Sequence, residues 1–232
     1  MKFITGFIFV LIVIVVIIPV IIFKYFISGG PRDLGVKYTP ADYTETHQKI
    51  GTEVVTASTS ASIKDSLLFS GKKETKVSLN SSEITAYLNA DKYIYAPLTN
   101  VQIKINPDGT GEASGILNIK NFITYASLTT PTADVQKAID RFHLNANLPF
   151  YAKGTLVVIN NQVNFNISQL EIGRIPVPQN YVSENQAALN DYATKKLNSI
   201  PNLQVRSLTL TDAKANLDAT VPQKVVKVEK QI

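Results

Sequence analysis

The sequence lacks cysteine and tryptophan and contains only two histidines and one methionine among its 232 residues. Without cysteine it can form no disulfide, no thiolate zinc site and no cysteine nucleophile. The lipid-modified cysteine that anchors bacterial lipoproteins is excluded for the same reason. Charged residues make up 18% of the chain, below the roughly 25% that is usual for soluble domains. The distribution of apolar residues therefore carries most of the information.

The chain has a mild excess of positive charge. Lys and Arg number 23 against 18 Asp and Glu, which gives a net charge of +5. No stripe of basic residues is interleaved with aromatic residues, the pattern that is typical of nucleic-acid binding. We therefore expect no nucleic-acid partner.

Residues 3–23 form an uncharged apolar run between Lys2 and Lys24. At 1.5 Å per residue, a helix of this length spans the hydrocarbon core of a bilayer, which is about 30 Å thick. A cleaved signal peptide would have a shorter apolar region of about 7–15 residues and a small-residue cleavage site, which residues 28–30 match poorly. We therefore expect residues 1–27 to be an uncleaved transmembrane anchor whose residues 3–23 contact the membrane lipid bilayer.

The orientation of this span follows from its position in the chain. Lys24, Arg32 and Lys37 follow the span, so the positive-inside rule alone does not decide the orientation. A very short tail before the span and a long domain after it are typical of a signal-anchor. We expect a single-pass protein of the cell membrane with its C-terminal domain outside the cytoplasm.

The rest of the chain divides into three predicted parts. Gly29-Gly30-Pro31 breaks the helix and opens a juxtamembrane stalk over residues 28–66. A folded extracytoplasmic domain follows over residues 67–222. Residues 223–232 are predicted to be a loose, charged tail.

Within the domain, alternation of apolar and polar residues predicts three hairpins, with turns at residues 107–109, 160–161 and 211–214. Strands joined by tight turns are antiparallel neighbours and not parallel ones. The fold class is therefore α+β: an N-terminal transmembrane helix followed by a curved antiparallel sheet of hairpins packed on two or three helices.

Helical periodicity predicts the helices of the domain. A short amphipathic helix over residues 81–90 begins with a capping box of Asn80 and Glu83, and a longer helix covers residues 182–198 with Ser183 and Gln186 in the same arrangement. Residues 121–129 and 133–142 also have helical spacing.

Four segments of the domain carry a family resemblance: 79–89 (LNSSEITAYLN), 101–115 (VQIKINPDGTGEASG), 148–163 (LPFYAKGTLVVINNQV) and 170–178 (LEIGRIPVP). In these segments the chain resembles membrane-anchored extracytoplasmic proteins of Gram-positive and related bacteria, of the YpmS-like type. Such proteins are distantly similar to tubular lipid-binding (TULIP-like) domains. The resemblance implies a long apolar groove between a wrapped sheet and its helices, able to hold acyl chains, and it assigns no catalytic residue.

No catalytic group stands out in the sequence. Asp108 lies in a stretch that a hairpin turn explains, and Asp140 and His143 are spaced to meet on a helix but have no nucleophile nearby. Glu171 and Arg174 are expected to form a surface ion pair. We therefore expect a protein that is not an enzyme and that uses no metal and no cofactor.

Aromatic and apolar residues are the candidates for ligand binding. Tyr93 and Tyr95 lie in an apolar loop that precedes a strand, and such a loop fits either core packing or contact with lipid. The other candidates lie in the helical segments and at the start of the second hairpin, where core packing and pocket lining look alike in sequence. The predicted ligand-binding residues are Tyr93, Tyr95, Phe122, Tyr125, Leu128, Phe142 and Phe150.

These patterns lead to two functional hypotheses. The first is a membrane-anchored binding module that accommodates a lipid or other apolar ligand in a groove between sheet and helices. The second is a structural or assembly protein of the cell envelope, whose domain docks an envelope protein partner. An internal cavity would favour the first, and a solid core would favour the second.

Overall fold

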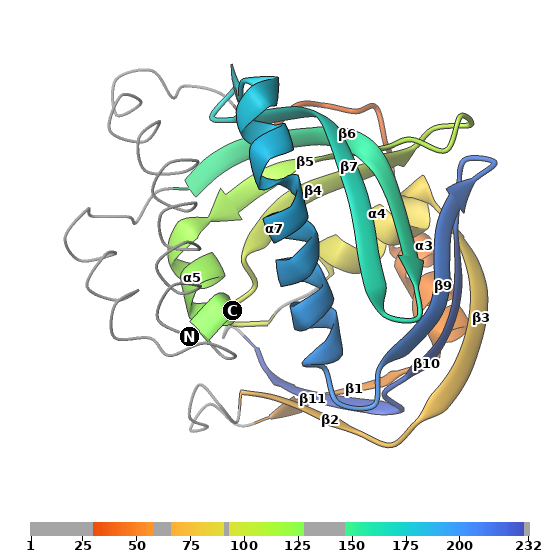
Figure 1. Ribbon diagram of the computed structural model, residues 1–232. Helices are drawn as coiled ribbons and strands as arrows, with labels where there is room; N and C mark the ends of the chain where they lie inside the picture. The colour runs from red at the N-terminus through yellow and green to blue at the C-terminus, as the bar shows by residue number, and fades with distance from the viewer. Residues whose placement is uncertain (1–29, 58–65, 91–92, 128–146, 230–232) are drawn as a thin grey trace.

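The structure, a computed structural model of the chain, describes residues 30–57, 66–90, 93–127 and 147–229. These residues form an α+β fold with a mostly antiparallel sheet, as predicted (Figure 1). The predicted anchor, residues 1–27, and the predicted helix at 133–142 lie outside them. No helix in the described part combines the length and hydropathy that a membrane span requires.

In chain order the elements are α3 (Pro40–Ile50), β1 (Glu53–Ala57), β2 (Leu67–Ser70), β3 (Lys73–Asn80), α4 (Ser81–Asn89), β4 (Leu98–Ile105), β5 (Gly111–Asn118), α5 (Ile119–Ser127), β6 (Asn147–Ile159), β7 (Gln162–Ile172), β8 (Ile175–Pro176), α7 (Gln179–Asn198), β9 (Gln204–Thr211), β10 (Lys214–Val221) and β11 (Lys224–Val228).

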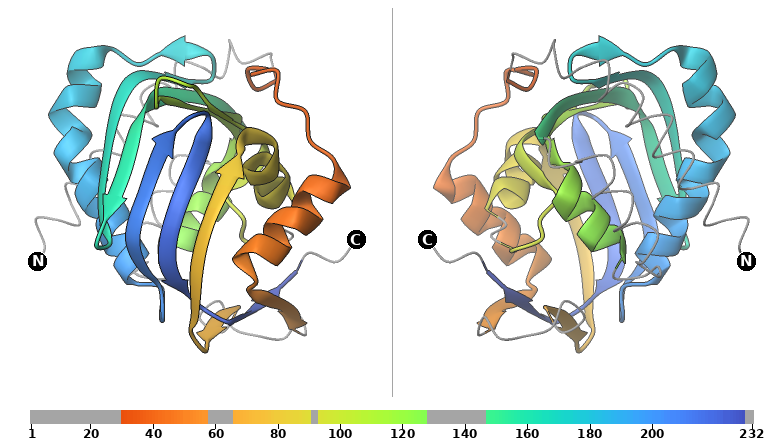
Figure 2. Two further views of the ribbon diagram at one scale, coloured as in Figure 1. Left: turned by 90° about the vertical axis from the view of Figure 1, so that its right-hand side faces the viewer. Right: turned by 90° about the vertical axis from the view of Figure 1, so that its left-hand side faces the viewer.

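Eight strands form a strongly curved sheet. Six of them follow the order β3-β10-β9-β6-β5-β4, while β7 pairs with β6, and β8 pairs with β7. The first part of the 13-residue strand β6 pairs with β5, and its last three residues pair with β9. Because β7 occupies the opposite edge of β6, the sheet splits into two arms, β5–β4 and β9–β10–β3, which curve round a common interior (Figures 1 and 2).

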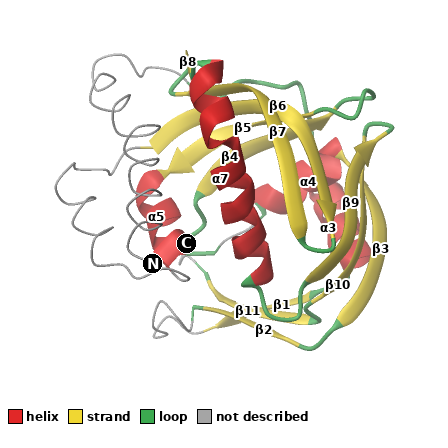
Figure 3. Cartoon of the chain, viewed as in Figure 1, coloured by secondary structure: helices red, strands yellow, loops and turns green. Residues whose placement is uncertain are grey.

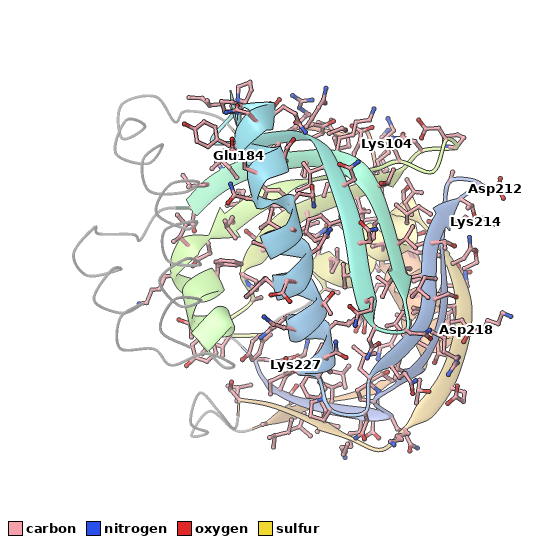
Figure 4. The ribbon with its side chains drawn as sticks, viewed as in Figure 1. Lys104, Glu184, Asp212, Lys214, Asp218 and Lys227 are labelled. Carbon is pink, nitrogen blue, oxygen red and sulfur yellow. The ribbon has the colours of Figure 1, made fainter. Side chains whose placement is uncertain are left out.

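Alternation along the strands separates an apolar inner face from a polar outer face. On the inner face, Val158, Val205, Ala219 and Val221 form a core cluster against which Leu197 of α7 packs. The outer face of the β9–β10–β3 arm carries an ion-pair network, in which the guanidinium of Arg206 lies 2.5 Å from Asp218 and 2.7 Å from Glu74. Asp218 points away from the interior in Figure 4.

A second, three-stranded sheet corrects two predicted boundaries. Strand β1 pairs in parallel with β11, and β11 pairs with β2 in antiparallel register. Helix α3 and β1 lie within the predicted stalk (28–66), and β11 lies within the predicted loose tail (223–232), so these parts of the two segments belong to the fold instead. Periodicity missed β1 and β11 because each strand is only five residues long and the two pair across the whole length of the domain.

Helix α3 is docked on α4 (Figure 2). Thr39 and Asp42 form a capping box at its start, and Gly51 ends it with a left-handed φ of 68°. The Lys49 ammonium forms an ion pair with Glu83 of α4. Glu83 is only 2% exposed and also accepts a bond from the Asn80 N–H at 2.7 Å, which confirms the capping box predicted for α4.

Two-residue turns of one type join three pairs of strands. Asn160-Asn161 lies between β6 and β7, Gly173-Arg174 between β7 and β8, and Asp212-Ala213 between β9 and β10. All six residues have φ between 48° and 68°, the type I′ geometry whose twist matches that of paired strands. The turns predicted at 160–161 and 211–214 are confirmed. Ala213 is an unusual occupant, because a Cβ disfavours left-handed backbone.

Helix α4 closes the free edge of strand β4 through polar side chains. The Ser81 hydroxyl accepts a bond from the N–H of Ile105 at 2.9 Å. The Thr85 hydroxyl accepts from the N–H of Ile103 at 3.0 Å and donates to its carbonyl at 3.3 Å. The Asn89 amide bonds the N–H and carbonyl of Val101 at 2.9 and 2.7 Å. Backbone groups that an edge strand normally leaves open are thus paired within the domain.

Helix α7 closes the edge of β7 in the same way. The N–H groups of Val163, Phe165 and Ile167 donate to Thr194, Asn190 and Gln186 at 2.9, 3.1 and 3.1 Å, and the Gln186 amide donates to the Phe165 carbonyl at 2.6 Å. Four helical residues rise about 6.0 Å and two strand residues about 6.7 Å. Polar residues at i, i+4 and i+8 of a helix therefore stay level with alternate residues of a strand.

The capping box predicted at Ser183 and Gln186 is wrong. Helix α7 begins one turn earlier, after Pro178, and has no side-chain cap at its start. The Ser183 hydroxyl donates to the Gln179 carbonyl within the helix, and Gln186 is engaged with β7. Serine and glutamine are residue types that form capping boxes, but here Ser183 bonds within the helix and Gln186 bonds β7.

Thr85→Val should lower the free energy of unfolding by about 1–3 kcal/mol, because it leaves the backbone N–H and carbonyl of Ile103 without their partner in a buried place. Thr85 is fully buried and valine keeps its shape. The control is Thr44→Val, since Thr44 is exposed and bonds only the Pro40 carbonyl of its own helix; its effect should stay within about 0.5 kcal/mol. Urea unfolding of residues 30–232 measures both, and equal losses would contradict the role assigned to Thr85.

Ala213→Gly should raise the free energy of unfolding by about 1 kcal/mol, because glycine adopts a positive φ without the steric cost that alanine bears. Ala187→Gly, at an exposed position inside α7, is the control and should lower it by about as much. A destabilising effect at both positions, in the same unfolding measurement, would mean that the turn is not left-handed in solution.

Candidate functional site

An apolar cavity of about 550 Å³ lies inside the curved sheet, between its two arms and helix α4. All six strands of the main path and β7 contribute to its wall, and the exposed atoms of that wall are almost all apolar. Helix α4 supplies Ile84 and Leu88, and the strands supply large side chains that include Phe165, Leu208, Leu210 and Leu217. Some apolar side chains on the inner face of the strands therefore pack against one another in the core, and others line the cavity.

Small residues on two neighbouring strands line part of the cavity. Gly111 lies opposite Gly154, and Ala113 lies opposite Ala152, in the pairing of β5 with β6. All four residues line the cavity. Ala113 and Ala152 carry only methyl groups and leave a shallow trough, whereas a Cβ at Gly154 would lie 2.0 Å from the Asn166 carbonyl oxygen of β7, so close approach of the two strands requires glycine there.

The charged residues along the cavity are Glu112 and Lys153. The Glu112 carboxylate is held on the outer face, where it accepts bonds from the Tyr151 hydroxyl at 2.8 Å and the Asn106 amide at 3.1 Å. Burial opposes its ionisation, but these bonds outweigh burial and keep the pKa of Glu112 below its ordinary value. Because these bonds hold the Glu112 carboxylate on the outer face, the surface of the cavity stays almost wholly apolar.

Tyr151 is the most perturbed titratable group near this wall. Burial, and then the bond to the Glu112 carboxylate, raise the pKa of Tyr151 to about 12. A phenol with this pKa stays protonated at neutral pH, so it acts as a hydrogen-bond donor and not as a base. The Tyr151–Glu112 pair therefore holds the sheet together on its outer face.

A second cavity of about 350 Å³ lies on the other side of Leu88, next to the three-stranded sheet. Its wall includes Tyr43, Tyr87 and Tyr93, together with Lys227, whose ammonium lies 3.5 Å from the Glu229 carboxylate. Because Leu88 lines both cavities, this one side chain of α4 separates them.

The loop residues predicted to bind ligand are packed into the fold. Tyr93 is 3% exposed, and its hydroxyl lies 2.8 Å from that of Ser66. The ring of Tyr95 packs edge-on against it, with ring centroids 5.7 Å apart. The N–H of Ile94 donates to the Val228 carbonyl at 3.0 Å. The loop is therefore held by the end of β11, and Tyr93 lines the second cavity rather than the first.

The other predicted ligand-binding residues are dispersed. Phe122 and Tyr125 lie on α5, and Phe150 lies on β6 opposite Gly115. Leu128 and Phe142 lie outside the described residues. Of the predicted residues whose side chains the structure describes, Tyr93, Tyr95, Phe122 and Phe150, none is among the residues that line the 550 Å³ cavity.

Most of the described residues that line it are aliphatic or small, and Phe165 is the one aromatic side chain among them. Strand β5 reads Gly111, Ala113, Gly115 at alternate positions, and β6 reads Ala152, Gly154. Glycine in a strand marks a bulge or the close approach of another group, and here the Phe150 ring lies against Gly115 and the backbone of β7 against Gly154. The alanines Ala113 and Ala152 are therefore the small residues that leave room in front of the sheet.

Within the described ranges, no group of three or more His, Asp or Glu side chains is arranged to hold a metal ion. No protein-family model matches the chain, and neither does any curated protein.

Proposed function

We propose that this protein is a membrane-anchored, extracytoplasmic binding module that holds the acyl chain of a lipid, or a similar apolar ligand, in the 550 Å³ cavity. The observation that carries the proposal is the cavity's almost wholly apolar wall. Its volume lies within the range of roughly 300–1,000 Å³ that small-molecule sites occupy. The ligand is held by burial, with no covalent or catalytic step.

Transfer of apolar surface from water into the cavity would drive binding. Each methylene group moved from water into such a cavity contributes about 0.8 kcal/mol. An unbranched chain suits a trough that is floored by Ala113 and Ala152 and walled by leucine side chains. The wall offers few polar partners, so the cavity itself does not select a particular headgroup.

The apolar run at residues 3–23 supports the same function. If that run is the transmembrane anchor, the cavity is carried on a domain that stays beside a supply of lipid. Anchoring replaces diffusion from solution with a high local concentration of ligand. The proposed location is therefore the outer side of the cell membrane.

Residues 30–232, purified without detergent, should carry a lipid in a ratio near one to one. Organic extraction followed by mass spectrometry identifies the lipid, and native mass spectrometry gives its stoichiometry. Ala113→Leu places a larger side chain on the cavity floor and should raise the Kd for the lipid about tenfold, corresponding to about 1.4 kcal/mol of lost binding free energy, and so lower lipid occupancy.

Ala187→Leu is the matched control, because it makes the same change at an exposed position on α7. It should leave lipid occupancy at the wild-type level. A folded wild-type protein that carries no lipid, and takes up none from vesicles, would overturn the proposal and favour the envelope-docking role. Equal occupancy in the two variants would show that the lipid is bound elsewhere.

A further inference from the structure

The chain that follows the apolar run is fastened to one corner of the domain. The side chain of Arg174, in the turn between β7 and β8, donates to the backbone carbonyls of Gly30 and Pro31 at 2.9 and 3.0 Å. The sequence predicted a pair between Arg174 and Glu171, and that prediction is wrong, since Arg32 takes Glu171 as its partner. Arg174 thus fixes the point at which the chain reaches the fold.

From that corner, residues 30–34 run across the outer face of the sheet. The Arg32 guanidinium pairs with Glu171 of β7 and lies over the ring of Tyr151 in β6, 3.9 Å from its centroid. The backbone N–H of Leu34 donates to the Gln102 side chain of β4 at 2.7 Å. These contacts hold the segment against three strands, β7, β6 and β4, which makes its exit point a fixed feature of the domain.

Only residues 24–29 separate the apolar run from this exit point. A fully extended chain covers at most about 3.5 Å per residue, so Gly30 lies within about 25 Å of residue 23. A helical continuation of the run through residue 27 would shorten this distance further. The corner beside Gly30 is therefore the part of the domain held nearest to a bilayer in which residues 3–23 are inserted.

Large apolar side chains are exposed at this same corner. Ile175 is 42% exposed and Tyr181 is 44% exposed. Ile175 directly follows Arg174, and Tyr181 lies in the first turn of α7, where its N–H donates to the Pro178 carbonyl. Figure 3 places β8 beside the start of α7. Tyrosine and an aliphatic neighbour beside an arginine are typical of the interface between membrane and water.

We propose that this corner, defined by Arg174, Ile175 and Tyr181, rests on the phospholipid bilayer that holds residues 3–23 and sets the orientation of the domain on the membrane. Its occupant is the lipid–water interface of that bilayer. Glu184 lies one turn beyond Tyr181 on α7 (Figure 4), so α7 brings a negative charge as well, and the proposed contact does not require anionic lipid. The proposal rests on the membrane span and not on the cavity, and the two proposals can fail separately.

The absence of tryptophan allows a direct test. The full chain carrying Ile175→Trp, and separately Tyr181→Trp, is reconstituted into phosphatidylcholine vesicles with and without bromine on the acyl chains. Bromine quenches only a tryptophan at or below the interface, so emission at both positions should fall roughly twofold or more. Bromine in both leaflets makes the result independent of insertion direction.

Ile159→Trp is the matched control. Ile159 is 48% exposed and lies at the other end of the β6–β7 hairpin, ten residues of β7 away, which is roughly 30 Å. Its emission should be unchanged by brominated lipid. Unquenched emission at 175 and 181, or equal quenching at all three positions, would overturn the proposal. So would a full chain that does not float with the vesicles, because residues 3–23 would then not be inserted.

Discussion

The hydrogen-bonding demand of the sheet edges at β4 and β7 is the constraint on which the rest of this structure depends. A curved sheet that does not close into a barrel leaves backbone N–H and carbonyl groups along its outermost strands, and such edges invite pairing with other chains. Here β4 and β7 satisfy them with side chains of α4 and α7. The helices are thereby held edge-on to the strands, which leaves the inner face of the sheet uncovered by them over part of its area. The cavity exists because these helices close edges rather than fill the interior.

Helix α4 connects this edge closure to the proposed binding site and to the N-terminal part of the domain. Ser81, Thr85 and Asn89 face β4, while Ile84 and Leu88 on another side line the cavity. The buried Glu83 receives the Lys49 ammonium of α3, and removing one partner of such a pair leaves an uncompensated charge. The chain that leads from the apolar run is therefore linked through α3 to the helix that forms one wall of the cavity.

Local features of the fold could be predicted from the sequence, and non-local ones could not. The turn at Asn160-Asn161 and the capping box at Asn80 depend on residues next to one another, and both are confirmed. The parallel pairing of β1 with β11 joins residues from opposite ends of the domain, and no short pattern encodes it. Gln186 carried a signal typical of a helix start but bonds β7 instead. In the candidate site, aromatic residues were expected, yet the ring of Tyr93 is packed into the fold, and the strands line the cavity largely with aliphatic side chains such as those of Leu208 and Leu217.

Amide hydrogen exchange on residues 30–232, read by NMR residue by residue, tests the edge closure most directly. If side chains of α4 and α7 pair with the edges, the backbone amides of β4 and β7 that face these helices should exchange as slowly as amides in the middle of the sheet, because their opening requires the helices to detach. Fast exchange at these amides, with the amides of β5 and β6 still protected, would contradict the account. The amides concerned are those of Val101, Ile103, Ile105, Val163, Phe165 and Ile167.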